Sequence, residues 1–224
     1  MTEGITQATT NDTLETPHIR VTFPVQGKHL PADHGYLLYA AITQNLPALH
    51  GATWLGIELI SGIPWDKGTI TLPTHGTSLH LRLPVRNFAG VLPLAGKRLE
   101  IAGRAIRLGA PVVHPLAPAA SLYARIVTIK KFTEPAPFLE AAQRQLIALG
   151  INVTLELPHD GITRYRRIIS VHGKKIVGFS LAAHDLNDQD SITLQTSGLG
   201  GRRAMGCGLF NPIARTQRTK GEAL

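Results

Sequence analysis

The chain has 224 residues, an apolar fraction of 43% and a formal net charge of +8. This apolar content is ample for a packed core, and no apolar run approaches the length of a membrane span, so neither whole-chain disorder nor membrane contact is expected. One cysteine excludes an intrachain disulfide, and we expect a cytoplasmic protein.

The positive charge is concentrated in the second half. Residues 1–120 hold 9 Lys/Arg against 7 Asp/Glu, whereas residues 121–224 hold 14 against 8. A basic half favours nucleic acid or another polyanion as a partner; the alternative is a merely basic soluble protein. The polar, Thr-rich stretch 1–17 has no apolar h-region and is predicted to be a disordered lead.

The first half alternates strand and helix signals. Apolar residues recur at every second position in 18–27, which predicts a strand, and at helical spacing in 30–47, with Asp33 as the expected N-cap. Apolar segments follow at 53–63 and 68–72. After them we predict a strand at 78–85, a short helix at 85–96 and two short strands in 97–109.

The second half repeats this order after a proline-rich segment. Residues 111–121 hold three prolines and little that could pair regularly, so the domain boundary is placed there. Beyond it the sequence predicts a strand at 121–132, a helix at 135–150, three strands in 151–158 and 162–182, a short helical or turn segment at 185–190, and strands at 191–195 and 209–213.

Two consecutive halves of this kind predict an α+β fold of two tandem ferredoxin-like domains, each βαββαβ with an antiparallel sheet. The N-terminal domain is placed at 18–115 and the C-terminal domain at 116–214. A basic tail is expected at 215–224.

The stretch SGLGGRRAMGCGLF (197–210) contains five glycines, two arginines and the only cysteine. A dinucleotide fingerprint would open a helix, and a phosphate loop would end in Lys-Ser or Lys-Thr; neither context is present. A nucleic-acid clamp remains, in which outward-turned amides and arginines grip phosphates. Its residues would be Gly198, Gly200, Gly201, Arg202, Arg203, Gly206 and Gly208. The alternative is a glycine-rich hairpin that binds no ligand.

Other basic residues are candidates for holding RNA. Arg164, Arg166 and Arg167 lie on a predicted strand of a hairpin that also carries Lys174 and Lys175. Lys130 and Lys131 end the strand predicted at 121–132, and Arg144 lies on the following helix. Such a surface could track phosphates or enter the groove of an RNA stem; a solvated basic face is the alternative.

The glycine stretch resembles the C-terminal motif of the Cas6 endoribonucleases, which process CRISPR repeat RNA. FPVQGKHLPADHGYLLYAAI (23–42), LPALHGATWLGIELISGI (46–63), SLHLRLP (78–84), LPLAGKRLEI (92–101), ARIVTIK (124–130) and RQLIALGI (144–151) resemble the branch found in myxobacterial-type CRISPR systems. The resemblance implies metal-independent cleavage of precursor CRISPR RNA within repeats by 2′-OH attack, giving 2′,3′-cyclic phosphate and 5′-OH ends. It implies no cofactor, CRISPR repeat RNA as partner, and leaves further effector-complex subunits open.

The family places its histidine within or just after the first helix. By this resemblance His50 is the first catalytic candidate and His34 the second, either as a proton carrier or as a helix cap. Tyr39 would position the scissile phosphate, or would simply pack in the core. Many relatives have a lysine near the histidine, and none occurs here between Lys28 and Lys67.

This departure leaves two alternatives open. One is a non-catalytic guide-RNA-binding subunit of a CRISPR effector complex, and the other is an adaptor for protein partners. No spacing of histidine, cysteine and acidic residues suggests a zinc site.

Overall fold

The computed structural model describes residues 16–158 and 165–213. Arg164, one of the predicted RNA-binding residues, lies outside them. Within the described ranges no helix is long and apolar enough to span a bilayer.

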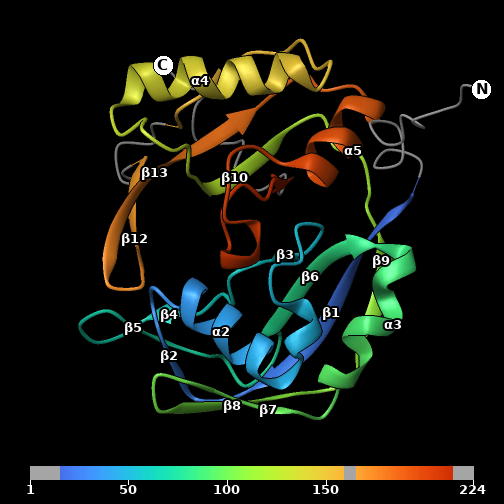
Figure 1. The fold of residues 1–224 in the computed structure, drawn as a ribbon, viewed down its shortest axis with the longest axis vertical. Helices are drawn as coiled ribbons and strands as arrows, with labels where there is room; N and C mark the ends of the chain where they lie inside the picture. Colours follow the sequence, from blue (N-terminus) through green and yellow to red (C-terminus); the bar gives the residue numbers. More distant parts are fainter. Residues whose placement is uncertain (1–15, 159–164, 214–224) are drawn as a thin grey trace, which may run out of the picture.

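The first half forms an antiparallel sheet with helices packed on one face (Figure 1). Its strands are β1 (His18–Gln26), β3 (Gly56–Ile57), β6 (Ser78–Pro84), β7 (Arg98–Ile101), β8 (Arg104–Leu108) and β9 (Val112–Pro115), and its α-helices are α2 (Gly35–Asn45) and α3 (Phe88–Val91). The strands follow the spatial order β3-β6-β1-β8-β7, and β9 also pairs with β1. Counting β1, β3, β6 and β8 as the four strands of the motif, this is the ferredoxin-like arrangement.

The second half repeats this topology. Its strands are β10 (Leu122–Val127), β11 (Leu155–Glu156), β12 (Arg166–Val171), β13 (Lys174–Ala183) and β14 (Asn211–Pro212), with helices α4 (Pro135–Ala148) and α5 (Asp188–Ser197). The order β11-β13-β10-β14 matches that of the first sheet, and β12 forms a hairpin with β13. The predicted α+β fold of two tandem ferredoxin-like domains is confirmed.

Smaller elements complete the structure. A three-stranded sheet of β2 (His29–Pro31), β5 (Thr69–Thr71) and β4 (Ile63–Pro64) lies beside α2 (Figure 1). Short 3-10 helices are η1 (Pro47–Leu49), η2 (Val85–Asn87), η3 (Leu92–Leu94) and η4 (Arg203–Met205).

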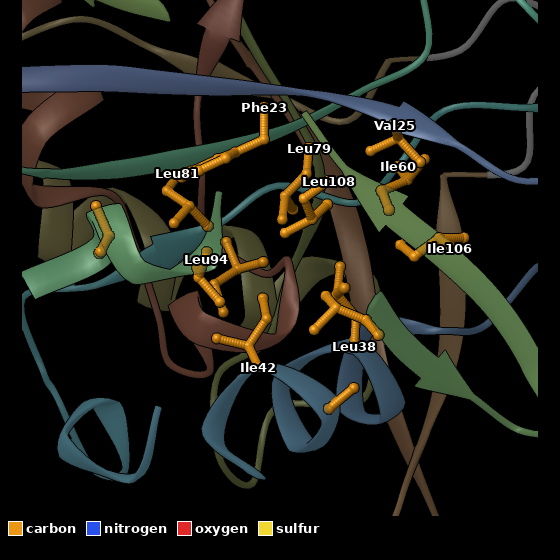
Figure 2. Packing of buried hydrophobic residues seen from close by; sticks show 14 of the residues in the cluster. Phe23, Val25, Leu38, Ile42, Ile60, Leu79, Leu81, Leu94, Ile106 and Leu108 are labelled. Carbon is orange, nitrogen blue, oxygen red and sulfur yellow. The ribbon is translucent and has the colours of Figure 1, made fainter. Parts of the chain in front are cut away.

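Each half has its own hydrophobic core. In the first, apolar residues of β1 and β6 point toward α2, and Phe23 and Leu79 belong to the same cluster as Leu38 and Ile42 of the helix (Figure 2). All four side chains are fully buried. The period-two pattern of the strands and the helical spacing of α2 therefore define one shared interior.

The strand predicted at 191–195 is wrong, because these residues belong to α5. Asn187 caps this helix, with its side-chain oxygen accepting from the Asp190 amide at 2.8 Å. Asp188 and Asp190 supply negative charge in the first turn, which the helix dipole favours. The cap and the acidic turn outweigh the strand-like alternation of Ile192 and Leu194.

Two further expectations need correction. Residues 112–115, expected not to pair, form β9 against β1. The first-half helix begins at Gly35, and the residue before it is His34, which makes no side-chain cap. The Asp33 carboxylate instead accepts a hydrogen bond from the Ser170 amide at 2.6 Å. Asp33 therefore binds the β12–β13 hairpin of the second half and does not cap α2.

Candidate RNA-binding cleft and active site

The glycine-rich loop, residues 198–208, leads from the end of α5 into β14 and lies between the two halves (Figure 1). The amides of all five glycines donate to acceptors within the protein: Gly198 to Leu194 O, Gly200 to Gln145 Oε1, Gly201 to Thr128 O, Gly206 to Arg203 O and Gly208 to Ile126 O. These amides are therefore engaged inside the fold, contrary to the expectation that they turn outward.

Close packing explains the glycines instead. Gly208 has a positive φ of 69°, and a Cβ there would lie 2.2 Å from the carbonyl oxygen of Leu199. A Cβ at Gly200 would lie 2.4 Å from the carbonyl oxygen of Thr128. Only glycine permits this conformation and approach together. The composition of the loop thus fixes its shape against β10.

The same loop packs against the start of α2. A Cβ on Gly35 would lie 2.4 Å from the carbonyl oxygen of Met205, and a Cβ on Gly206 would lie 2.6 Å from Leu59 Cγ. The contact joins residues far apart in sequence, one from each ferredoxin-like domain. It places the loop arginines beside the helix that sequence analysis associated with catalysis.

The two loop arginines have different surroundings. Arg202 is exposed and has a left-handed backbone with φ 64°. Arg203 is half-buried, and its Nη1 donates to the Ser197 carbonyl at 2.7 Å. Burial, and secondarily the charge of Arg82, lowers the pKa of Arg203 to about 10, so this guanidinium stays charged at neutral pH. Arg202 presents its charge to solvent, whereas Arg203 anchors the loop.

The cysteine of the loop is not a candidate nucleophile. Cys207 is fully buried, and burial raises its pKa to about 11. A thiol in this state is protonated and inert at neutral pH.

His34 is fully buried, with both ring nitrogens hydrogen-bonded. Nδ1 lies 2.8 Å from the Pro31 carbonyl oxygen and Nε2 accepts from the Ile60 amide at 3.1 Å. The acceptor role of Nε2 fixes a neutral ring with its proton on Nδ1. Burial lowers its pKa, against the opposing effect of the Pro31 hydrogen bond. This geometry ties β2, α2 and the segment at residue 60 together.

His50 is exposed and follows η1. Its ring centroid lies 6.2 Å from that of Tyr39 on α2. The Tyr39 hydroxyl accepts a hydrogen bond from the Gly51 amide at 3.0 Å, which holds the turn containing His50 against the helix. The structure thus brings two of the three catalytic candidates together, while His34 lies at the other end of α2.

A cavity of about 410 Å³ lies between the domains and is bordered by the glycine-rich loop at Gly206. Its lining includes His34, Glu58 and Ile60 from the first domain and Tyr123, Arg125, Gly206 and Asn211 from the second. The Arg125 side chain is exposed, and its guanidinium stays charged at neutral pH. The cavity therefore combines a cation, an aromatic ring and polar groups.

Sequence reasoning missed Tyr123 and Arg125 as site residues. They alternate with the buried Leu122 and Ala124 along β10, and this pattern placed them on the opposite face of the strand. The alternation along β10 therefore already showed that these two side chains point away from the core of the second domain. What the pattern could not show is that the first domain covers part of this face.

The β12–β13 hairpin reaches across to α2 (Figure 1). The Tyr36 hydroxyl lies 3.1 Å from Nδ1 of His172, and the two ring centroids are 4.5 Å apart. Of the predicted basic residues here, Arg166, Lys174 and Lys175 are exposed and Arg167 is half-buried. The tip of the hairpin, which carries Lys174 and Lys175, thus lies against the start of α2.

The remaining predicted cations lie near the glycine-rich loop. Lys130 and Lys131 are exposed in the turn that follows β10, just beyond Thr128, whose carbonyl binds the Gly201 amide. Exposed Arg144 precedes Gln145, whose side chain accepts from the Gly200 amide. The three cations therefore lie within three residues of groups that bind the loop amides.

The family model described as Cas6 Crispr matches residues 19–215. The chain belongs to the Cas6 family. A CRISPR-associated endonuclease Cas6 from Myxococcus xanthus (strain DK1622) is 44% identical over 202 residues, covering 90% of this chain and 84% of the relative. The expected family resemblance is confirmed.

Two solved structures of similar fold are much more distant in sequence. The product of a Cas6-related gene from Pyrococcus furiosus superimposes with a TM-score of 0.64 at 14% identity, covering 89% of this chain and 99% of that one. A RAMP protein that binds different RNA substrates gives a TM-score of 0.58 at 12% identity, covering 88% and 100%. These likenesses support the tandem ferredoxin-like fold of this Cas6 protein.

Proposed function

We propose that this Cas6 protein is an endoribonuclease that cuts precursor CRISPR RNA within its repeats and yields mature guide RNA. The observation that carries the proposal is the packing of the glycine-rich loop, with its exposed Arg202, onto the helix flanked by the candidate histidines. The 44% identity to a CRISPR-associated endonuclease supports the same assignment.

The proposed reaction is an intramolecular displacement at phosphorus. The ribose 2′-oxygen attacks the adjacent phosphate and its proton passes to a base; the bond to the 5′-oxygen breaks and that oxygen takes up a proton. The products are a 2′,3′-cyclic phosphate and a 5′-OH end, and the step requires no metal. The protein has to align the attacking oxygen, move two protons and neutralise charge on phosphate oxygens.

His50 is the proposed proton-transfer residue, because it is exposed and lies beside Tyr39. Tyr39 holds the turn of His50 through the Gly51 amide, and we assign it a positioning role. The geometry favours a structural role for His34, since proton transfer there would break one of its two hydrogen bonds. RNA would be held by Arg202, the cations of the β12–β13 hairpin, and Lys130, Lys131 and Arg144.

The decisive experiment uses the repeat RNA of its own locus, end-labelled, in EDTA. Matched RNAs carry a single 2′-deoxy nucleotide at each candidate position. Cleavage in EDTA that one such substitution abolishes supports 2′-OH attack without metal and locates the scissile bond. His50→Ala should reduce the single-turnover rate at least 100-fold, whereas His75→Ala, at an exposed histidine in a loop, should leave it unchanged.

A second candidate function is that of a guide-RNA-binding subunit without catalysis. It is favoured by the absence of lysine between Lys28 and Lys67 and by the full hydrogen bonding of His34. Tight binding of repeat RNA with no cleavage, with or without divalent metal, would favour this candidate over the endoribonuclease.

A further inference from the structure

The outer face of the three-stranded sheet carries an aromatic surface that the proposed site does not use. In the antiparallel register His29 pairs with Thr71, and Thr71 pairs with Ile63. The Trp65 amide donates to the Thr69 carbonyl at 3.0 Å, which continues the same register. Directly paired residues share a face, so Trp65, Ile63 and His29 lie on one side. Leu30 and Ile70, on the other side, are buried in the core.

Trp65 is the most exposed large apolar residue of this face, with 64% of its surface accessible, and Ile63 beside it is 62% accessible. The centroid of the Trp65 ring lies 4.0 Å from that of His29. The His29 Nδ1 in turn lies 3.2 Å from the Thr71 hydroxyl. The indole is therefore supported from one side by a ring that is itself held in place. Trp65 and Ile63 together form an exposed apolar patch on this face.

The charges around this face favour an anionic partner. Lys28 precedes β2 and Lys67 lies in the turn between β4 and β5, and both are exposed. Asp66 is an exposed acid in the same turn. The half-buried Thr69 and Thr71 supply hydroxyl groups. A flat aromatic ring flanked by cations and hydroxyl groups is suited to a stacked base with its phosphates.

The opposite, buried face of this sheet borders the cavity between the domains. Ala32, Gly62 and Ile70, which belong to or adjoin its strands, also line the cavity of about 410 Å³. β2 leads through Asp33 and His34 directly into α2. An RNA strand that extends from the cavity would reach Trp65 by passing around an edge of the sheet.

We propose that Trp65, supported by His29, is a stacking site for one unpaired nucleobase of the repeat RNA, outside the cleavage site. The proposal deepens and rests on the proposed RNA-processing function. It commits to a single-stranded nucleotide as the occupant, because Lys28, Lys67 and the threonine hydroxyl groups accompany the aromatic surface.

The chain offers a direct reporter of this contact. It has two tryptophans, and Trp54 is half-buried and packs against the first core. Trp54→Phe leaves Trp65 as the single indole. We expect saturable quenching of its fluorescence when repeat RNA with a 2′-deoxy nucleotide at the cleavage position is added. A Trp65 signal that does not change while the RNA binds overturns the proposal.

Affinity measurements test the energetic role. Trp65→Ala should raise the Kd for the same RNA about tenfold, and Trp65→Phe should recover most of the loss, because stacking needs the ring. The salt dependence of the Kd should keep its slope in both variants, since stacking releases no counterions. Lys67→Ala should instead lower that slope. Ile147→Ala on α4, at a residue 57% exposed, is the matched control for loss of an exposed apolar side chain.

The outcomes separate this inference from the proposed function. If the parent protein neither binds nor cuts repeat RNA, the proposed function is wrong. The stacking site, which rests on that function, is then wrong as well. If the parent binds and cuts RNA but Trp65→Ala has an unchanged Kd, the stacking site alone is overturned. A change only in self-association or in binding of another protein would likewise overturn it.

Discussion

The Arg82 guanidinium lies 2.7 Å from the Glu58 carboxylate in the interior between the two domains. The atom that contacts Glu58 is Nη2, whereas Nη1 donates to the carbonyl oxygens of Gln195 and Phe210, at 2.8 and 2.7 Å. These two residues lie just before and just after the glycine-rich loop. A single arginine of the first domain therefore holds both ends of a loop of the second.

Replacing this arginine should destabilise the fold. Arg82 is fully buried, and Arg82→Met would remove its ion pair with Glu58 and leave two carbonyl groups without their donor. Among the residues that the structure describes, Arg20 would remain as the ion-pair partner of Glu58. We expect the free energy of unfolding to fall by about 3 kcal/mol, the usual scale for breaking a buried ion pair. Urea denaturation measures the loss. Arg20→Met is the control. Its side chain is 27% exposed, so the loss of unfolding free energy should be clearly smaller. Equal losses for the two variants would contradict the role of Arg82 in holding the loop.

The contact between α2 and the loop can be tested with one methyl group. Gly35→Ala would place a Cβ 2.4 Å from the Met205 carbonyl oxygen, so the loop would have to move away from the helix. We expect a stability loss of about 1–3 kcal/mol together with weaker binding of repeat RNA. In Gly90→Ala the new Cβ meets nothing within 4 Å, so this variant should match or exceed parental stability. Similar behaviour of the two variants would argue against the contact.

Arg202 and Arg203 should respond differently to substitution. Arg202→Ala removes an exposed charge, so we expect weaker RNA binding, a salt slope reduced by about 0.7 and an unchanged melting temperature. Arg203→Ala removes the hydrogen bond to Ser197 and the packing of a half-buried side chain, so its melting temperature should fall. Filter binding across a salt series and thermal unfolding distinguish the two. Equal salt slopes for the parent and Arg202→Ala would remove Arg202 from the RNA contact.

The stability of the protein should decrease in mild acid. Burial lowers the pKa of His34 below 6.5, and the pKa values of His18 and His80 shift the same way, also mainly through burial. The unfolded chain then binds more protons than the folded one as the pH falls below about 6.5, so stability is complete above this pH and is lost below it. Each histidine can contribute a slope of up to about 1.4 kcal/mol per pH unit.

Urea denaturation between pH 5 and 8 checks this dependence. His34→Ala should be less stable at pH 8, because it removes two hydrogen bonds, but should show a shallower slope below pH 6.5. The exposed-site variant His75→Ala should keep the parental slope. An unaltered slope in His34→Ala would show that His34 does not titrate in the way its burial implies.

Local patterns predicted most of the fold, because alternation and helical spacing report which face of an element is apolar. The alternation of Val21, Phe23 and Val25 predicted β1, and the span from Pro135 to Gly150 predicted α4 nearly to its ends. The pattern failed at 191–195, where Ile192 and Leu194 alternate as in a strand but the Asn187 cap starts a helix.

The site was harder to predict, because its contacts join distant parts of the chain. Arg82 stands between Leu81 and Leu83 in β6, and alternation indicates only that it faces away from the first core. No local pattern shows that the second domain buries Arg82. In the same way, the glycines of the loop indicated a tight backbone, whereas three of their amides, those of Gly200, Gly201 and Gly208, find acceptors on or just after distant elements, α4 and β10.

The meeting of Gly35 with Met205 has a consequence for how the protein reaches its native state. Contacts between such distant segments form slowly, since a large loop of chain has to close before they contribute. Each ferredoxin-like half has its own core and can collapse first, leaving the union of helix and loop as a late step. If the two halves were expressed separately, the first would contain His50 and Tyr39 and the second would contain Arg202. Cleavage of repeat RNA would then be expected only after the two halves are mixed and associate.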